Sequence, residues 1–279
     1  MAKLTGASYA KIALIIAFGA LAIAALGFGG CAAGCRSLGG ETNMGSASVD
    51  ASSVKNLSIS WAAGEVNVFV VDGGDAIELS ETGPRGLTKA QQMRWGVSGD
   101  TLSIDYGSWF SCFMLGRKDL EVRIPRSYAD DLGLVRMDAA SGTYRLDGFG
   151  CAELKVDLAS GQLDATDVTA KELSLDVASG QASVAGSFAD RVTLKTASGQ
   201  TRVACAGACP RELAADVASG SVAVVLPEGS GFAAHVDKAS GSFLCAFPTT
   251  QDGGRFVCGD GAGKIDVKLA SGEFKIEQG

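Results

Sequence analysis

Hydrophobic and polar residues alternate along most of the chain, which is the period-2 pattern of strands that bury one face. Leu57, Ile59 and Trp61 share one face of an expected strand, and Val66 and Val68 share one face of the next. Glycine-rich stretches separate these short runs and mark turns. The pattern therefore predicts a fold built from strands, each with one buried and one solvated face.

The tripeptide Ala-Ser-Gly recurs seven times in the second half, each time between two alternating stretches. The copies begin at Ala140, Ala159, Ala178, Ala197, Ala218, Ala239 and Ala270, in steps of 19, 19, 19, 21, 21 and 31 residues. A period of about 20 residues indicates repeated units that stack on one another. Each unit is expected to be a strand, a corner at Ser-Gly and a second strand. Glycine would allow the sharp bend, and serine would bond the local backbone.

The registers of the seven copies agree. Residues one, three and five positions before each copy are apolar, apart from Thr196 and Lys238, and two further rows follow each glycine. Stacking at a spacing of about 4.8 Å would bury these rows against their counterparts. We therefore predict an all-β fold, a β-solenoid or β-helix-like stack of two-strand repeats. An antiparallel sandwich with incidental Ala-Ser-Gly turns is the alternative.

The outward row two positions before each alanine is charged. It consists of Asp138, Asp157, Asp176, Lys195, Asp216, Asp237 and Lys268. If the copies stack in chain order, consecutive aspartates repel one another and Lys195 relieves the repulsion. A solvated face explains the row, and weak Ca²⁺ binding is a hypothesis for it.

An uncharged run of 19 residues, 12–30, lies near the N-terminus. At about 1.5 Å per residue it can cross a hydrocarbon core of about 30 Å, and Lys3 and Lys11 before it favour an N-in orientation. We predict a cytoplasmic stub and transmembrane helix over 1–35, in a single-pass protein of the cell membrane. A cleaved signal peptide is an alternative. So is lipidation at Cys31 or Cys35, because small residues precede both.

Residues 36–53 are rich in glycine, serine and alanine and predict a flexible linker. Residues 54–279 would then form one extracytoplasmic domain. The chain has a net charge of −7, and this acidic balance argues against nucleic acid as a partner.

No catalytic constellation is visible in the sequence. The single histidine, His235, lies at an outward register, and no nucleophile elbow accompanies it. The segment 259–264 lacks the spacing of a phosphate-binding loop. We therefore predict no catalytic residue, no cofactor and no metal site.

Six of the eight cysteines lie in the predicted domain, where an extracytoplasmic location would permit disulfides. Spacing suggests Cys205–Cys209 and Cys245–Cys258, which leaves Cys112 with Cys151. A zinc site is the alternative.

The chain resembles a known family in several stretches. They are Leu57-Ser-Ile59, Gly64-Glu-Val66-Asn-Val68, Leu120-Glu-Val122-Arg-Ile124-Pro125, the repeated Ser-Gly units, Gly261-x-Gly263-x-Ile265-x-Val267 and Ser271-Gly272-Glu273-Phe274-Lys275-Ile276. They look like the DUF4097 putative-adhesin family of bacterial envelope proteins, with its toast-rack β-domains. The resemblance implies an envelope location, often beside membrane-stress systems, and brings no catalytic residue set.

These observations predict a membrane-anchored, non-enzymatic envelope protein. Its β-solenoid would bind an envelope protein or a surface ligand. The alternatives are a glycan-active β-helix enzyme, a lyase or hydrolase, and a mechanical spacer. The functional surface is expected where the repeat is broken, at Lys195, Lys238, 106–118 and 247–263.

Overall fold

The structure is a computed structural model that describes residues 42–83, 87–107 and 117–279. Strands make up 65% of this part of the chain and helices only a few short turns, which confirms the all-β prediction. Within it, no helix combines the length and apolarity needed to span a bilayer. The expected transmembrane segment, together with Cys31, Cys35 and Cys112, lies outside the described residues.

The strands and short helices of the described residues, in chain order, are β1 (Asn43–Met44), β2 (Ala47–Asp50), η1 (Ala51–Ser53), β3 (Asn56–Trp61), β4 (Glu65–Val71), β5 (Ala76–Thr82), η2 (Lys89–Gln91), β6 (Arg94–Ser98), β7 (Thr101–Asp105), β8 (Asp119–Pro125), α3 (Arg126–Ala129), β9 (Leu132–Ala139), β10 (Thr143–Asp147), β11 (Gly150–Leu158), β12 (Gln162–Val177), β13 (Gln181–Thr196), β14 (Gln200–Cys205), β15 (Glu212–Val217), β16 (Ser221–Leu226), β17 (Phe232–Lys238), β18 (Ser242–Cys245), β19 (Thr250–Asp252), β20 (Arg255–Cys258), β21 (Gly263–Leu269) and β22 (Glu273–Gln278).

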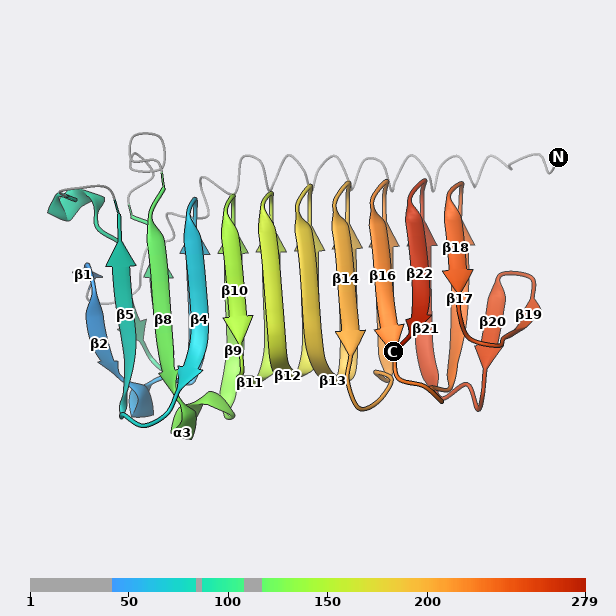
Figure 1. Ribbon diagram of the computed structural model, residues 1–279, viewed down its shortest axis with the longest axis horizontal. Coiled ribbons are helices and arrows are strands. Elements are labelled where there is room, and N and C mark those ends of the chain that lie inside the picture. The colour runs from blue at the N-terminus through green and yellow to red at the C-terminus, as the bar shows by residue number, and fades with distance from the viewer. Residues whose placement is uncertain (1–41, 84–86, 108–116) are drawn as a thin grey trace.

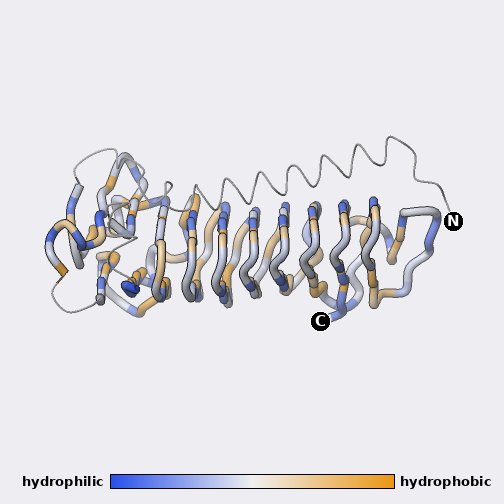
Figure 2. The backbone as a smooth tube through the Cα atoms, turned by 90° about the horizontal axis from the view of Figure 1, so that it is seen from above, coloured by the Kyte–Doolittle hydropathy of each residue, from blue (hydrophilic) through white to orange (hydrophobic). Residues whose placement is uncertain are grey.

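Parallel pairing arranges these strands in two rows that face each other (Figure 1). Row A runs β7-β3-β9-β11-β12-β13-β15-β21-β17. Row B runs β8-β4-β10-β12-β13-β14-β16-β22-β18. The long strands β12 and β13 belong to both rows, because each passes from row B into row A. Each coil thus contributes one strand to each row, as the repeat predicted, and Figure 2 shows the coils in series.

The core lies between the two rows and consists of the apolar ladders that the registers predicted. Leu154 and Val156 in row A and Leu163 and Ala165 in row B are all 1% exposed or less. Thr196, which interrupts one ladder, is buried too, and its hydroxyl lies 2.9 Å from that of Thr201 in the same coil. This hydrogen bond lets two polar side chains occupy an apolar interior.

The Ala-Ser-Gly corners join row A to row B along one narrow edge. Each serine donates its backbone N–H and its hydroxyl to the carbonyl of the alanine in the adjacent coil, as Ser198 does to Ala178 (2.9 and 3.1 Å). The same hydroxyl bond occurs at Ser141, Ser160, Ser179, Ser219, Ser240 and Ser271. The expected bond to the local backbone is therefore wrong, because the serines bond the adjacent coil and continue the sheet ladder through the bend.

The coils do not stack in chain order. The last coil, β21–β22, lies between β15–β16 and β17–β18 (Figure 1). The chain reaches this place by a turn at 259–262 that passes Gly231, where a Cβ would lie only 1.8 Å from the Asp260 carboxylate. The assumption of sequential stacking is therefore wrong for the last two copies.

Antiparallel strands close the ends of the stack. At the N-terminal end, β6 and β1 continue row A, and β5 and β2 continue row B. The predicted linker is wrong for residues 43–53, because they form β1, β2 and η1 of this cap, while 36–41 lie outside the described residues. At the C-terminal end, the 247–263 insertion places β20 and β19 on β17.

A buried ion pair holds the N-terminal cap together. The Nζ atom of Lys118, which is fully buried, lies 2.7 Å from the Glu81 carboxylate. It also donates to the carbonyls of Gln91 (2.9 Å) and Tyr106. Trp61 and Tyr106 lie around the ammonium, and the Trp61 indole donates to the Lys118 carbonyl at 2.9 Å. A buried charge needs this degree of compensation.

Candidate functional site

The stack presents three long surfaces to solvent: the outer face of row A, the corner edge and the outer face of row B. Because the two rows alternate inward and outward residues, the outer faces carry the polar positions of every strand. The sequence predicted functional residues on row A and at the interruptions of the repeat. The contacts of the polar side chains on each surface show which of them has groups free to bind a ligand.

On the row A face, the predicted Asp row exists, but the protein's own cations neutralise it. Arg136 donates to Asp138 at 2.6 Å and to Asp157 at 2.9 Å, and it links the two coils. Burial raises the pKa of Asp157 to about 6, aided by the neighbouring Asp138, while Arg136 opposes the rise. Burial also raises the pKa of Asp176, and Lys195 on the next coil opposes that rise. These carboxylates are half-buried rather than freely solvated.

The inverted coil order completes the neutralisation at the far end of this row. Lys268 lies between Asp216 and Asp237 in register, and its Nζ atom is 3.7 Å from the Asp216 carboxylate. The described residues contain no group of three or more His, Cys, Asp or Glu side chains that could hold a metal ion. The Ca²⁺ hypothesis and the zinc alternative therefore have no support in this part of the chain.

The corner edge carries an open hollow of about 520 Å³ lined by serines, glycines, Gln200 and Glu273. Its corner serines are not set up as nucleophiles, because each hydroxyl donates to a main-chain carbonyl of the adjacent coil and not to a base. His235 lies on the row A face, in register with Asp266 on one side and Arg255 on the other. No serine of the corner edge is near that face, so no triad forms among the described residues.

The predicted disulfides are wrong for the cysteines that the structure describes. Cys151, Cys205, Cys209, Cys245 and Cys258 are all free thiols. Cys205 is buried, whereas Cys209 lies against Pro210, whose carbonyl is 3.5 Å from its Sγ atom. Cys258 instead lies 3.4 Å from the Ser230 carbonyl. Burial raises the pKa of Cys205 to about 12 and that of Cys209 to about 11, so neither is a reactive thiolate.

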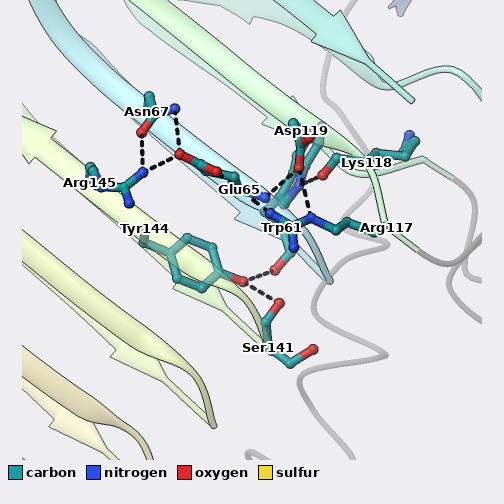
Figure 3. Close-up of polar contacts among 9 residues, drawn as sticks. All are labelled: Trp61, Glu65, Asn67, Arg117, Lys118, Asp119, Ser141, Tyr144 and Arg145. Atoms are coloured by element: carbon teal, nitrogen blue, oxygen red, sulfur yellow. Dashed lines mark hydrogen bonds and ion pairs between the residues drawn. The ribbon is translucent and has the colours of Figure 1, made fainter. Parts of the chain in front are cut away.

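The row B face has the most varied chemistry near the N-terminal cap, and sequence reasoning missed it. Glu65 accepts bonds from Asn67 (3.2 Å) and Arg145, and Arg117 lies 3.6 Å from it (Figure 3). The hydrogen bond from Asn67, together with the nearby charges of Arg145 and Arg117, holds the pKa of Glu65 below its usual value. Asp119 accepts the Glu65 backbone N–H at 2.8 Å and tethers β8 to this corner.

Just beyond this network, Phe69 is an aromatic ring on an outward position. Most other aromatic side chains of the parallel coils point inward and are buried, as at Trp61, Tyr144, Phe188, Phe232 and Phe274, and the half-buried Phe243 shares the register of Phe274. Phe69 is only half-buried and lines an open hollow on the row B face. The alternation of β4 could have revealed it, since Val66 and Val68 fix Phe69 on the opposite face.

These features define a class of protein: a two-row parallel β-stack whose coils are joined by serine–glycine corners and whose outer faces carry paired charges. The chain belongs to the Toastrack DUF4097 family, whose model matches residues 54–277. The family resemblance seen in the sequence is thereby confirmed.

Several solved structures are similar to this chain at low sequence identity. A putative adhesin from Bacteroides fragilis is 12% identical and has a TM-score of 0.47, over 85% of this chain and 97% of that one. A putative adhesin from Parabacteroides distasonis is 11% identical, with a TM-score of 0.44 over 86% and 98%. A putative lipid binding protein from Parabacteroides distasonis is 16% identical, with a TM-score of 0.43 over 85% and 97%. No curated protein matches the chain.

Proposed function

We propose that the protein is a membrane-anchored, non-enzymatic envelope protein that presents its β-stack outside the membrane as a binding surface. The observation that carries this proposal is that the polar side chains of the stack bond or pair with groups on adjacent coils. Corner serines bond the next coil, and the Asp row is paired with Arg136, Lys195 and Lys268. An enzyme of the glycan-cleaving kind would instead gather carboxylates and an activated base around one cleft.

The anchor rests on the sequence alone. The uncharged run at 12–30 and the lysines before it favour a single-pass, N-in arrangement with the stack on the outer side. The family membership supports an adhesin-like role, and a link to envelope-stress response is part of the proposal. A rigid stack with continuous ladders is suited to hold a binding surface away from the membrane.

Crosslinking in intact cells, followed by mass spectrometry, tests the proposal. We expect crosslinks between the 54–279 domain and an envelope protein or surface glycan, and we expect externally added protease to reach this domain. A domain that is reached only after the cells are broken would overturn the proposal. Crosslinks confined to cytoplasmic proteins would overturn it as well.

A further inference from the structure

The outward-facing Phe69 lines a hollow of about 440 Å³ on the row B face. The hollow spans four neighbouring strands, β8, β4, β10 and β12, which are held in parallel register. Its polar lining consists of Asn67, Glu121, Arg145, Asp147, Asp164 and Thr166. An aromatic ring among convergent polar groups in a concave surface is a common plan for ligand sites.

The polar groups of the hollow include both hydrogen-bond donors and acceptors. Arg145 lies between Asn67 and Asp164 in register, and its guanidinium turns to the β4 side, where it bonds Glu65 and approaches Asn67 (3.4 Å; Figure 3). On the β12 side of Arg145, no described residue forms a hydrogen bond or an ion pair with the Asp164 carboxylate. A half-buried carboxylate without a partner is an open acceptor for a ligand hydroxyl.

Charges around the ring argue against a simple ion as the ligand. Arg123 reaches to within 6.0 Å of the Phe69 ring centre from β8 and is bonded to Glu121 at 2.5 Å. On the other side, Asp147 accepts the Thr166 hydroxyl at 2.6 Å. Guanidinium groups on both sides oppose a cation, and three carboxylates oppose an anion.

We propose that this hollow is a binding site for a neutral, hydroxyl-rich glycan. Each sugar hydroxyl both donates and accepts, so it matches a surface where guanidinium, amide and carboxylate groups alternate. The weakly positive C–H face of a sugar ring can lie on the negative face of Phe69. The parallel strands hold these groups on a rigid surface, so binding orders few side chains. This inference deepens the proposed function by naming its ligand class, and it rests on that function.

Calorimetric titration of the full chain in lipid nanodiscs tests the site. The probes are the neutral hexasaccharides maltohexaose, cellohexaose and hexa-N-acetylchitohexaose, with hexagalacturonate as the anionic probe and spermine as the cationic one. We expect at least one neutral hexasaccharide to bind with a Kd below about 1 mM. Phe69→Leu, which keeps an apolar side chain but removes the ring, should weaken it about tenfold or more. Asp164→Asn should weaken it about fivefold or more.

Glu172→Gln is the matched control, because it removes one carboxylate from the exposed part of row A, remote from the hollow. Its affinity should stay within about twofold of the wild type. Asp164→Asn is a surface change, so it tests the site even if Phe69→Leu lowers the Tm. No binding of any neutral hexasaccharide would overturn the inference. So would binding that ignores both variants, or binding of spermine or hexagalacturonate alone.

The two proposals can fail separately. A protein partner found by crosslinking, with no sugar bound in calorimetry, would leave the proposed function standing and remove the glycan site. Sugar binding that depends on Phe69 and Asp164, in a domain that protease reaches only in broken cells, would support the glycan site and overturn the proposed function.

Discussion

The glycines of the Ala-Ser-Gly corners are required by contact between coils rather than by backbone conformation. Gly142 and Gly161 have positive φ, but Gly199 and Gly220 do not. At every corner, however, a Cβ would lie within 2.1–2.6 Å of the glycine carbonyl of the adjacent coil. A positive φ therefore explains the glycine at only some copies, whereas the close stacking of carbonyl on Cα explains it at all seven.

Gly199→Ala should therefore destabilise the stack. The new methyl group would meet the Gly180 carbonyl at 2.3 Å and a Val177 methyl group at 2.8 Å. We expect a loss of about 2–3 kcal/mol in the free energy of unfolding, measured by urea titration. The control is Ser198→Ala at the same corner, which removes one hydroxyl bond and should cost about 1 kcal/mol. Equal losses for the two variants would refute the steric explanation.

Asp157 is the second residue whose position has a measurable consequence. Burial raises its pKa to about 6, against about 3.9 in an unfolded chain. The folded state thus binds more protons than the unfolded state between these values, and stability falls as pH rises from about 4 to about 6. Arg136 and Asp138 contact this carboxyl, and Lys155 lies near it, so the charges of all three influence the pKa of Asp157.

Asp157→Asn should remove this pH dependence. The variant and the wild type should be about equally stable near pH 4, and at pH 7.5 the variant should be more stable by about 1–2 kcal/mol, after allowance for partial exposure of the carboxyl. Urea titrations across this pH range would measure the difference. Glu172→Gln, an exposed change, should follow the wild type. A constant offset between Asp157→Asn and the wild type at all pH values would contradict the argument.

At the scale of the strand, charge selects which coil lies next to which. Stacking in chain order would place Asp216 opposite Asp237, since each lies two residues before the alanine of its Ala-Ser-Gly corner. The observed order puts Lys268 of β21 between them, so that each acid faces a cation. Like charges directly opposite each other in a ladder are destabilising, and opposite charges are favourable. The inverted order therefore has an electrostatic cause as well as the connection through 259–262.

Lys268→Asp should weaken this arrangement by about 1–2 kcal/mol, because it aligns three acids on the face of row A. Adding Asp237→Lys to Lys268→Asp restores an opposite charge on one side of position 268 and leaves Asp216 paired with Lys195, so this double variant should recover about half of the loss. Thermal unfolding at low ionic strength would measure both, and added salt should shrink the difference. Failure of the double variant to recover any stability would show that the pairing does not contribute to coil order.

Over the whole molecule, the repeat made the inward rows predictable, because seven copies of one pattern fix what faces in. It could not give the order of the coils, since corners with the same residues stack equally well on any neighbour. The Cys205–Cys209 pairing was wrong because nearness in sequence says nothing of side-chain direction. Phe69 was overlooked because it lies in a coil without an Ala-Ser-Gly copy. The candidate site was thus the least predictable part, since it lies where the repeat is irregular.

The position of the last coil also affects the order in which the segments can fold. A chain that is synthesised from its N-terminus presents 227–262 before 263–279, yet the final structure needs the later segment on the inside. Until the last 17 residues arrive, β17 and β18 have no permanent neighbour toward the rest of the stack. Residues 227–262 must therefore wait, or briefly pair with β15 and β16 and then open again. The stack is complete only when β21 and β22 have been inserted between coils that precede them in the sequence.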